Sequence, residues 1–317
     1  MGVLKFRLFM VIAVLFGIAY AASVMIGTAM GVTNFYSYAL MAFGMLFFQY
    51  LIGPFMVNMS YRVKTIGPND NAVLYGMVSE MAIAAKIKMP KVGIADIGIP
   101  NAFAYGNMFT GGHVCVTPAI MNLLNKRELR AVIGHEISHL KNNDVFITTM
   151  VSVVPMIMFF IGRSFMFSRG SRREHNNLAL VGLAAFILYF VSNLLVLYVS
   201  RIREYFADRG SVDLGNPPDA MASSLFKLVY GSARTDREQV RQAEGFKAFF
   251  VNDPSQAQHE ILELRQLDLN GDNSIDMNEL QMLKNNRIKV KFSDRLMEGM
   301  STHPNMLKRI KKISEYA

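Results

Sequence analysis

Long apolar runs alternate with polar stretches along this chain. The first two runs occupy residues 8–30 and 35–57, and no charged residue occurs between Arg7 and Arg62. A helix that spans a bilayer needs about 20 apolar residues, so each run is long enough for one. The first run is too long for a cleavable signal peptide, and the second follows it at once. We therefore predict two N-terminal membrane helices.

Two further apolar runs, at 145–162 and 178–200, predict a membrane hairpin that returns the chain to the side that it left. The first of these runs contains Pro155, which should kink its helix. Lys5 and Arg7 place the N-terminus inside by the positive-inside rule. The same rule conflicts with four arginines in the hairpin loop, so two alternatives stay open. Either the hairpin enters the bilayer without crossing it, or Lys5 and Arg7 determine the orientation before the hairpin is inserted.

The polar stretches carry the periodicities of a folded domain. A helix is predicted at 71–86, and short strands at 91–97, 102–106 and 113–117. We divide the chain into two N-terminal membrane helices (1–58), the first half of a catalytic domain (59–144), the hairpin (145–200) and the second half of that domain (201–317).

A metal-binding motif lies in the first half of this domain, where the sequence His-Glu-Ile-Ser-His begins at His135. On a helix, His135 and His139 share a face one turn apart, so both imidazoles can reach one zinc ion. Glu136 lies beside them and can act as general base on a water molecule. Asn125 and Glu128 match a capping box and predict the start of this helix. A chance pentapeptide with two unrelated histidines is the alternative.

A third ligand is expected downstream, because zinc hydrolases usually take three protein ligands and leave one position open. Glu204 and Asp208 stand four residues apart on a predicted helix that follows the hairpin, and so share a face. We predict Glu204 as the third ligand. Asp208 would accept the other N–H of a ligand histidine and fix its tautomer. A solvated helix face of mixed charge is the alternative.

These motifs together resemble those of the HtpX-type membrane zinc metallopeptidases, which are related to the CAAX prenyl-protein proteases. HEISH is followed by REYFAD at 203–208, as in that family. The segment NAFAYG at 101–106 resembles the family's NAFATG, with Tyr105 in place of threonine. STHP at 301–304, followed by RI at 309–310, resembles its ending. The resemblance covers nearly the whole chain and implies a peptidase with one zinc ion per chain.

The resemblance also implies roles for residues outside the ligand set. His303 and Arg309 become candidates to stabilise the developing oxyanion, with a capping or packing role as the alternative for His303. An extended substrate would pair with the strand that precedes the motif helix, and a plain buried strand is the alternative. This substrate strand comprises Asn101, Ala102, Phe103, Ala104, Tyr105 and Gly106.

The stretch 268–279 matches the loop of an EF-hand and lies in an insert at about 255–292, where the family is expected to have a short linker. Asn273 replaces the usual glycine, and asparagine tolerates a left-handed backbone. Helical patterns at 259–267 and 277–286 flank the loop. We predict a calcium ion here that modulates activity, with an acidic surface turn as the alternative. The expected ligands are Asp268, Asn270, Asp272, Ser274, Asp276 and Glu279.

Composition agrees with a membrane protein, since 52% of the residues are hydrophobic and the mean hydropathy is +0.25. The net charge of +9 comes with basic residues that flank the apolar runs. They suit anionic lipid headgroups, and no nucleic-acid fold signature is visible, so we predict no nucleic-acid partner. The single Cys115 excludes an intramolecular disulfide and fits a reducing compartment.

We predict a mainly α membrane protein with four apolar helices and a cytoplasmic, zincin-like α+β catalytic domain that has a small strand edge. As the resemblance implies, it would be a multi-pass zinc endopeptidase of the bacterial inner membrane that cleaves misfolded or damaged membrane proteins at the cytoplasmic face under stress. Its partners would be polypeptide substrates and the lipid bilayer. A CAAX-type prenyl-protein protease and a non-catalytic scaffold or calcium sensor are the alternatives.

Overall fold

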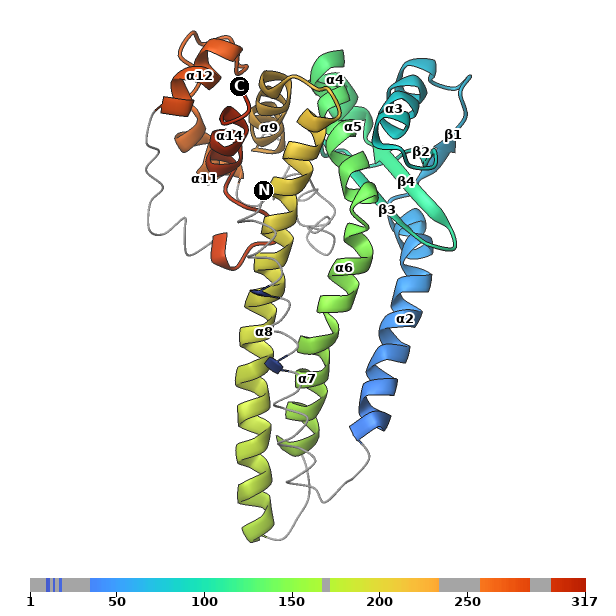
Figure 1. Cartoon of the computed structure of the whole chain (residues 1–317), viewed down its shortest axis with the longest axis vertical. Coiled ribbons are helices and arrows are strands. Elements are labelled where there is room, and N and C mark those ends of the chain that lie inside the picture. Colours follow the sequence, from blue (N-terminus) through green and yellow to red (C-terminus); the bar gives the residue numbers. More distant parts are fainter. Residues whose placement is uncertain are drawn as a thin grey trace. The chain divides into compact units, whose positions relative to one another are not determined.

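The structure is a computed structural model that describes residues 35–166, 172–233, 257–285 and 298–317, with a few positions between 10 and 18 (Figure 1). The chain forms two compact units. The first unit comprises Met1–Ile52 and Phe146–Ile202, and the second comprises Gly53–Val145 and Arg203–Ala317. The predicted helix at 8–30 lies largely outside the described residues.

Apolar helices build the first unit. The second predicted run forms α2 (Phe35–Ser60), which continues into the second unit, and the hairpin consists of α6 (Asp144–Val151), α7 (Val153–Met166) and α8 (Arg172–Asp213). In the part of the chain that is described, the segments Asp144–Arg163 and Ala179–Asp213 are long and apolar enough to cross a membrane. Two of the four expected spans therefore meet this criterion of length and composition.

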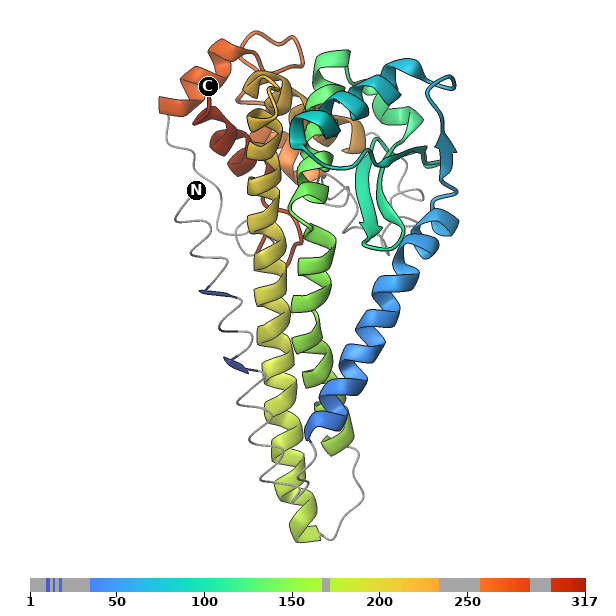
Figure 2. The ribbon, with the colours of Figure 1, turned by 45° about the vertical axis from the view of Figure 1, so that its right-hand side comes forward.

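A kink was predicted at Pro155, and the structure shows an interruption of the helix just before it, between α6 and α7. A proline ring clashes with the carbonyl group four residues earlier, which here belongs to Val151, and α6 ends at that residue. Beyond the break, α7 packs along α8, and Figure 2 shows the two helices side by side. Their contact is a buried cluster of Met158, Ile161, Phe165 and Ala185.

A four-stranded sheet forms one layer of the second unit. Its strands are β1 (Lys64–Ile66), β2 (Lys91–Ile94), β3 (Ala102–Asn107) and β4 (Gly111–Val116), in the order β1-β2-β4-β3. β2 and β4 are parallel, whereas β3 and β4 form an antiparallel hairpin. The three predicted strands are confirmed. β1 was not predicted, because three residues carry no readable alternation.

Two helices pack on this sheet and start where the sequence signals a cap. α3 (Ala72–Ala85) begins after Asn71, whose side chain accepts a hydrogen bond from the N–H of Leu74. α5 (Lys126–Lys141) begins with the predicted capping box of Asn125 and Glu128. Their apolar faces meet the sheet in one core that includes Val78, Met81, Val114, Val132 and Ile137.

The remaining helices of the second unit join the same core. They are the short α4 (Pro118–Leu123), α9 (Pro218–Ala233), α11 (Ala257–Leu264), α12 (Met277–Asn285) and α14 (Met306–Ser314). α11 and α12 confirm the helices that were predicted on either side of the acidic loop. Both contact α14, the helix that carries Arg309.

A glycine allows α5 and α8 to approach closely in the second unit. A Cβ atom at Gly210 of α8 would lie 1.9 Å from the Oγ atom of Ser138 and 2.6 Å from its Cβ atom on α5. Because these distances are far below van der Waals contact, any side chain at Gly210 must push the two helices apart. Their separation decides whether residues of α5 and α8 can share one ligand.

We expect Gly210→Ala to destabilise the protein by about 1–3 kcal/mol through overpacking. Gly76→Ala in α3 is the matched control, because nothing lies within 4 Å of a Cβ atom placed there. That control should be neutral or stabilising by about 0.4–1 kcal/mol. Denaturant unfolding of the purified protein in detergent measures both, and equal midpoints for the two variants would contradict the close approach.

Candidate metal centre

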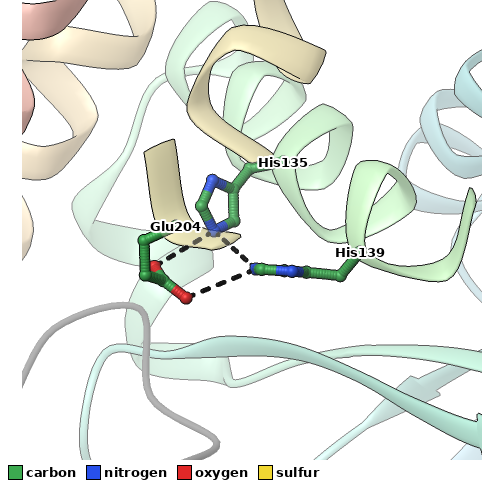
Figure 3. Close-up of side chains that lie close together, drawn as sticks. All are labelled: His135, His139 and Glu204. Atoms are coloured by element: carbon green, nitrogen blue, oxygen red, sulfur yellow. Dashed lines mark hydrogen bonds and ion pairs between the residues drawn. The ribbon is translucent and has the colours of Figure 1, made fainter. Parts of the chain in front are cut away.

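Three side chains that could ligate a metal converge in the second unit. His135 and His139 come from α5 and Glu204 comes from α8, and one ligand atom of each lies within 4.8 Å of the others. Figure 3 shows the two imidazoles and the carboxylate pointing toward one another. Within the described residues, no other group of three such side chains meets this criterion.

The distances between these ligand atoms suit a small ion. The two Nε2 atoms of the histidines lie 3.1 Å apart. The Glu204 carboxylate oxygens lie 3.6 Å from Nε2 of His135 and 3.5 Å from Nε2 of His139. Ligands at about 2.0–2.2 Å from a tetrahedral zinc ion are separated by roughly 3.4 Å. Two imidazoles and one carboxylate, with little solvent exposure, are a donor set that fits zinc.

Each of the two histidines has a carboxylate close to its Nδ1 atom. The Nδ1 atom of His135 lies 2.9 Å from Oδ1 of Asp208, as predicted for one ligand histidine. The Nδ1 atom of His139 lies 2.5 Å from Oδ2 of Asp144, which the sequence reasoning missed. A carboxylate at Nδ1 leaves Nε2 free for a metal and makes the ring more basic. Both carboxylates are therefore placed to orient the pair of histidines toward Glu204.

Asp144 also connects the end of the motif helix to α8. It is the first residue of α6, and its Oδ1 atom lies 3.0 Å from Nε of Arg203. Burial lowers the pKa of His139, but the hydrogen bond and charge of Asp144 raise it to about 9. The signal in the sequence was an acidic residue five positions after His139, directly before an apolar run.

Arg309 is fully buried and contacts two of the predicted site carboxylates. Its Nε and Nη2 atoms donate to both oxygens of Asp208 at 2.9 and 2.6 Å, and its Nη1 atom lies 3.1 Å from Oε2 of Glu204. A bidentate pair of this kind fixes the carboxylate in place. The geometry thus favours a positioning role, and contact with a developing oxyanion stays a prediction.

His303 reaches the same place from the segment before α14. Its Nδ1 atom lies 3.6 Å from Oε2 of Glu204, and 6% of the residue is exposed. The structure therefore brings this histidine to the candidate metal ligands, and its role in catalysis stays a prediction.

Glu136 lies between the histidines on α5 and beside β3. It is buried and accepts a hydrogen bond from the backbone N–H of Ala104. Burial raises its pKa to about 7, and the nearby carboxylate of Glu204 adds to the shift. A carboxylate with a pKa near the working pH can both accept and return a proton, which is what a general base of this kind requires.

The predicted substrate strand is β3, preceded by Asn101. It is the terminal strand of the described sheet, and it packs against α5. Phe103 and Tyr105 face away from the motif helix into a cluster with Tyr61, and the Tyr105 hydroxyl group lies 2.5 Å from Oδ1 of Asn58. The tyrosine that departs from the family pattern therefore contributes to packing. Pairing of substrate with β3 stays a prediction.

The predicted calcium loop connects α11 and α12. Asn273 has a φ angle of +61°, the left-handed backbone that was expected at this position. The Asp268 carboxylate accepts hydrogen bonds from three backbone N–H groups of the loop, and Glu279 accepts one from Leu269. The acidic side chains are not among the described groups that converge on one point, so calcium binding stays a prediction.

We expect Asp144→Asn to weaken zinc binding by about 10–100-fold, the usual effect of removing a carboxylate behind a ligand histidine. Competition with a chelating dye measures the dissociation constant without any substrate. Asp213→Asn is the control, because Asp213 is exposed and pairs only with Arg209 four residues away on α8. Unchanged affinity in Asp144→Asn would show that the contact with His139 does not orient the ring.

Comparison with known proteins agrees with this site. A model of peptidase family M48 matches residues 68–317. A "Protease HtpX homolog" of Methanothermobacter thermautotrophicus is 46% identical over 226 residues, which cover 71% of this chain and 86% of the relative. Another, of Thermoplasma acidophilum, is 29% identical over 314 residues, which cover 96% of this chain and 93% of the relative.

The crystal structure of S. mikatae Ste24p is among the similar solved structures: it is 14% identical with a TM-score of 0.48, covering 95% of this chain and 67% of that chain. The family match extends over most of the chain and contains every residue of the candidate metal centre. The chain therefore belongs to peptidase family M48 and is a metallopeptidase of the HtpX type.

Proposed function

We propose that this protein is a membrane-anchored zinc endopeptidase that cleaves misfolded or damaged membrane proteins at the cytoplasmic face. The observation that carries the catalytic part is the convergence of His135, His139 and Glu204 with Glu136 beside them. The two helical segments that are long and apolar enough to cross a bilayer support the membrane anchor.

The chemistry is divided between the metal and the chain. His135, His139 and Glu204 would hold zinc, which supplies a Lewis acid that acidifies water and polarises a carbonyl group. Glu136 takes the proton of the attacking water and delivers it to the leaving nitrogen. Asp144 and Asp208 keep both imidazoles in the tautomer that presents Nε2, and Arg309 holds Glu204 in place.

Substrate selection would depend on the backbone of the substrate and little on its side chains. A polypeptide that pairs with β3 presents its own amide groups beside α5, so unfolded segments are accepted with little demand on side-chain identity. This preference suits the removal of misfolded proteins. Cleavage restricted to a C-terminal tripeptide would instead indicate a prenyl-protein protease. Membership of a peptidase family favours an enzyme over the non-catalytic scaffold.

We propose only that the membrane is a cell membrane, without assigning it to a bacterial inner membrane. A bacterial inner membrane was expected, but the curated relatives come largely from archaea, among them Methanothermobacter, Aeropyrum and Thermoplasma. We also propose that the second unit lies in the cytoplasm.

A calcium ion in the loop at 268–279 would modulate this activity. The effect of calcium binding would be transmitted through α14, which contacts both helices that flank the loop. The Glu260 side chain of α11 accepts a hydrogen bond from the N–H of Met306, and Lys311 donates one to the carbonyl group of Leu283 on α12. Ordering of the loop would therefore reach the helix that carries Arg309.

We expect Glu136→Gln to lower the cleavage of an unfolded model protein by at least about 100-fold, because the base is lost. Zinc stoichiometry should stay at one per chain. Glu80→Gln is the matched control, since this glutamate is exposed and pairs with Arg130 on the surface. Full activity in Glu136→Gln would overturn the assignment of the base. Retention of zinc by a triple variant that lacks both histidines and Glu204 would overturn the metal site.

We expect calcium to raise the stability of the protein by about 2.7 kcal/mol at a concentration 100 times its dissociation constant. Glu279→Gln should remove this effect, because it weakens the last ligand of the loop. Thermal unfolding with and without calcium measures the shift, and peptidase activity is followed over the same titration. Activity that stays constant from nanomolar to millimolar calcium would exclude modulation.

A further inference from the structure

The tip of the β3–β4 hairpin presents two large apolar side chains on the surface of the second unit. Met108 is 79% exposed and Phe109 is 64% exposed. No charged residue occurs from 107 to 112. Single exposed apolar residues are ordinary, whereas here two large apolar side chains are adjacent on a turn that carries no charge.

Side-chain hydrogen bonds and close backbone contacts hold the turn that carries this pair. The Asn107 side chain accepts hydrogen bonds from the N–H groups of Phe109 and Thr110 at 3.0 and 2.7 Å. At its base, Gly106 has a φ angle of +144°, and a Cβ atom there would lie 2.2 Å from the carbonyl oxygen of Gly111. A preorganised tip loses little conformational freedom when it docks.

The hairpin is attached to the C-terminal end of α2. Phe103 and Tyr105 of β3 share a buried cluster with Val57 and Tyr61. The Tyr105 hydroxyl group also contacts Asn58. In both views the end of the hairpin lies beside the last turns of α2 (Figures 1 and 2). The apolar tip therefore adjoins this helix within the second unit.

The exposed face of α2 is itself apolar up to that end. Within the second unit, its last turns expose the large apolar side chains of Phe55, Met56 and Met59. Exposed Arg62 and Lys64 follow the helix directly. Basic side chains just beyond an apolar helix reach the lipid headgroups. The apolar side chains and the basic pair together indicate a lipid–water boundary near the end of α2.

We propose that the hairpin tip, Met108 and Phe109, inserts into the headgroup–acyl boundary of the bilayer that α2 is predicted to enter. This surface would hold β3 at the lipid surface, where unfolded segments of membrane proteins emerge. A phospholipid bilayer is the occupant that we infer, because the tip lies beside the last turns of α2, whose exposed side chains are also apolar. The proposal rests on the membrane anchoring given under the proposed function.

The chain contains no tryptophan, so a single introduced tryptophan reports on its own surroundings. The full chain carrying Phe109→Trp is reconstituted into phosphatidylcholine vesicles, with and without bromine on the acyl chains. Phe48→Trp on the exposed face of α2 reports membrane insertion. Ile83→Trp on α3, at a residue that is 75% exposed, is the aqueous control. Met108→Trp repeats the test at the tip should the first variant fold poorly.

We expect brominated lipid to quench Phe109→Trp and Phe48→Trp strongly, with blue-shifted emission, and to leave Ile83→Trp unchanged. Quenching of Phe48→Trp without quenching at the tip would overturn the hairpin contact and leave the membrane anchor intact. A blue shift at the tip without quenching would mean that protein, such as a second copy of the chain, covers it, and would also overturn the proposal. No quenching at either place would overturn the membrane anchor as well.

Discussion

The buried guanidinium group of Arg309 is the interaction on which the metal centre depends. A charge with no exposure to water is tolerated only when it is paired and hydrogen-bonded. Here the pairing is with Asp208 and Glu204, two carboxylates one turn apart on α8 that would repel each other without it. Through Asp208 the same contact reaches His135 on α5. One side chain from α14 thus connects three helices at the site.

Much of this centre could be predicted from the sequence, because its residues lie at helical spacings. The capping box at Asn125 fixed the start of α5, and the four-residue separations placed His135 with His139 and Glu204 with Asp208. Asp144 could not be predicted in the same way. It belongs to the helix after the motif, and its contact with His139 depends on how the chain turns between α5 and α6. Spacing rules do not describe such a turn.

The same limit applies to the fold. Strands β2, β3 and β4 were readable because each is bounded by glycine, proline or asparagine. β1 owes its existence to pairing with β2, which is a tertiary contact. The contacts of Arg309 are likewise tertiary, since 101 residues separate it from Asp208. The resemblance to a family pointed to Arg309, but only the geometry showed that its guanidinium group binds the carboxylates of Asp208 and Glu204.

The position of Arg309 along the chain affects how the protein is made. Domains emerge from synthesis with the N-terminal part first, and α14 follows every other element that contributes to the centre. The histidines, Glu204 and the apolar helices are therefore complete before the residue that aligns Glu204 and Asp208 is added. Glu204 and Asp208 can therefore be paired by Arg309 only after α14 has been synthesised.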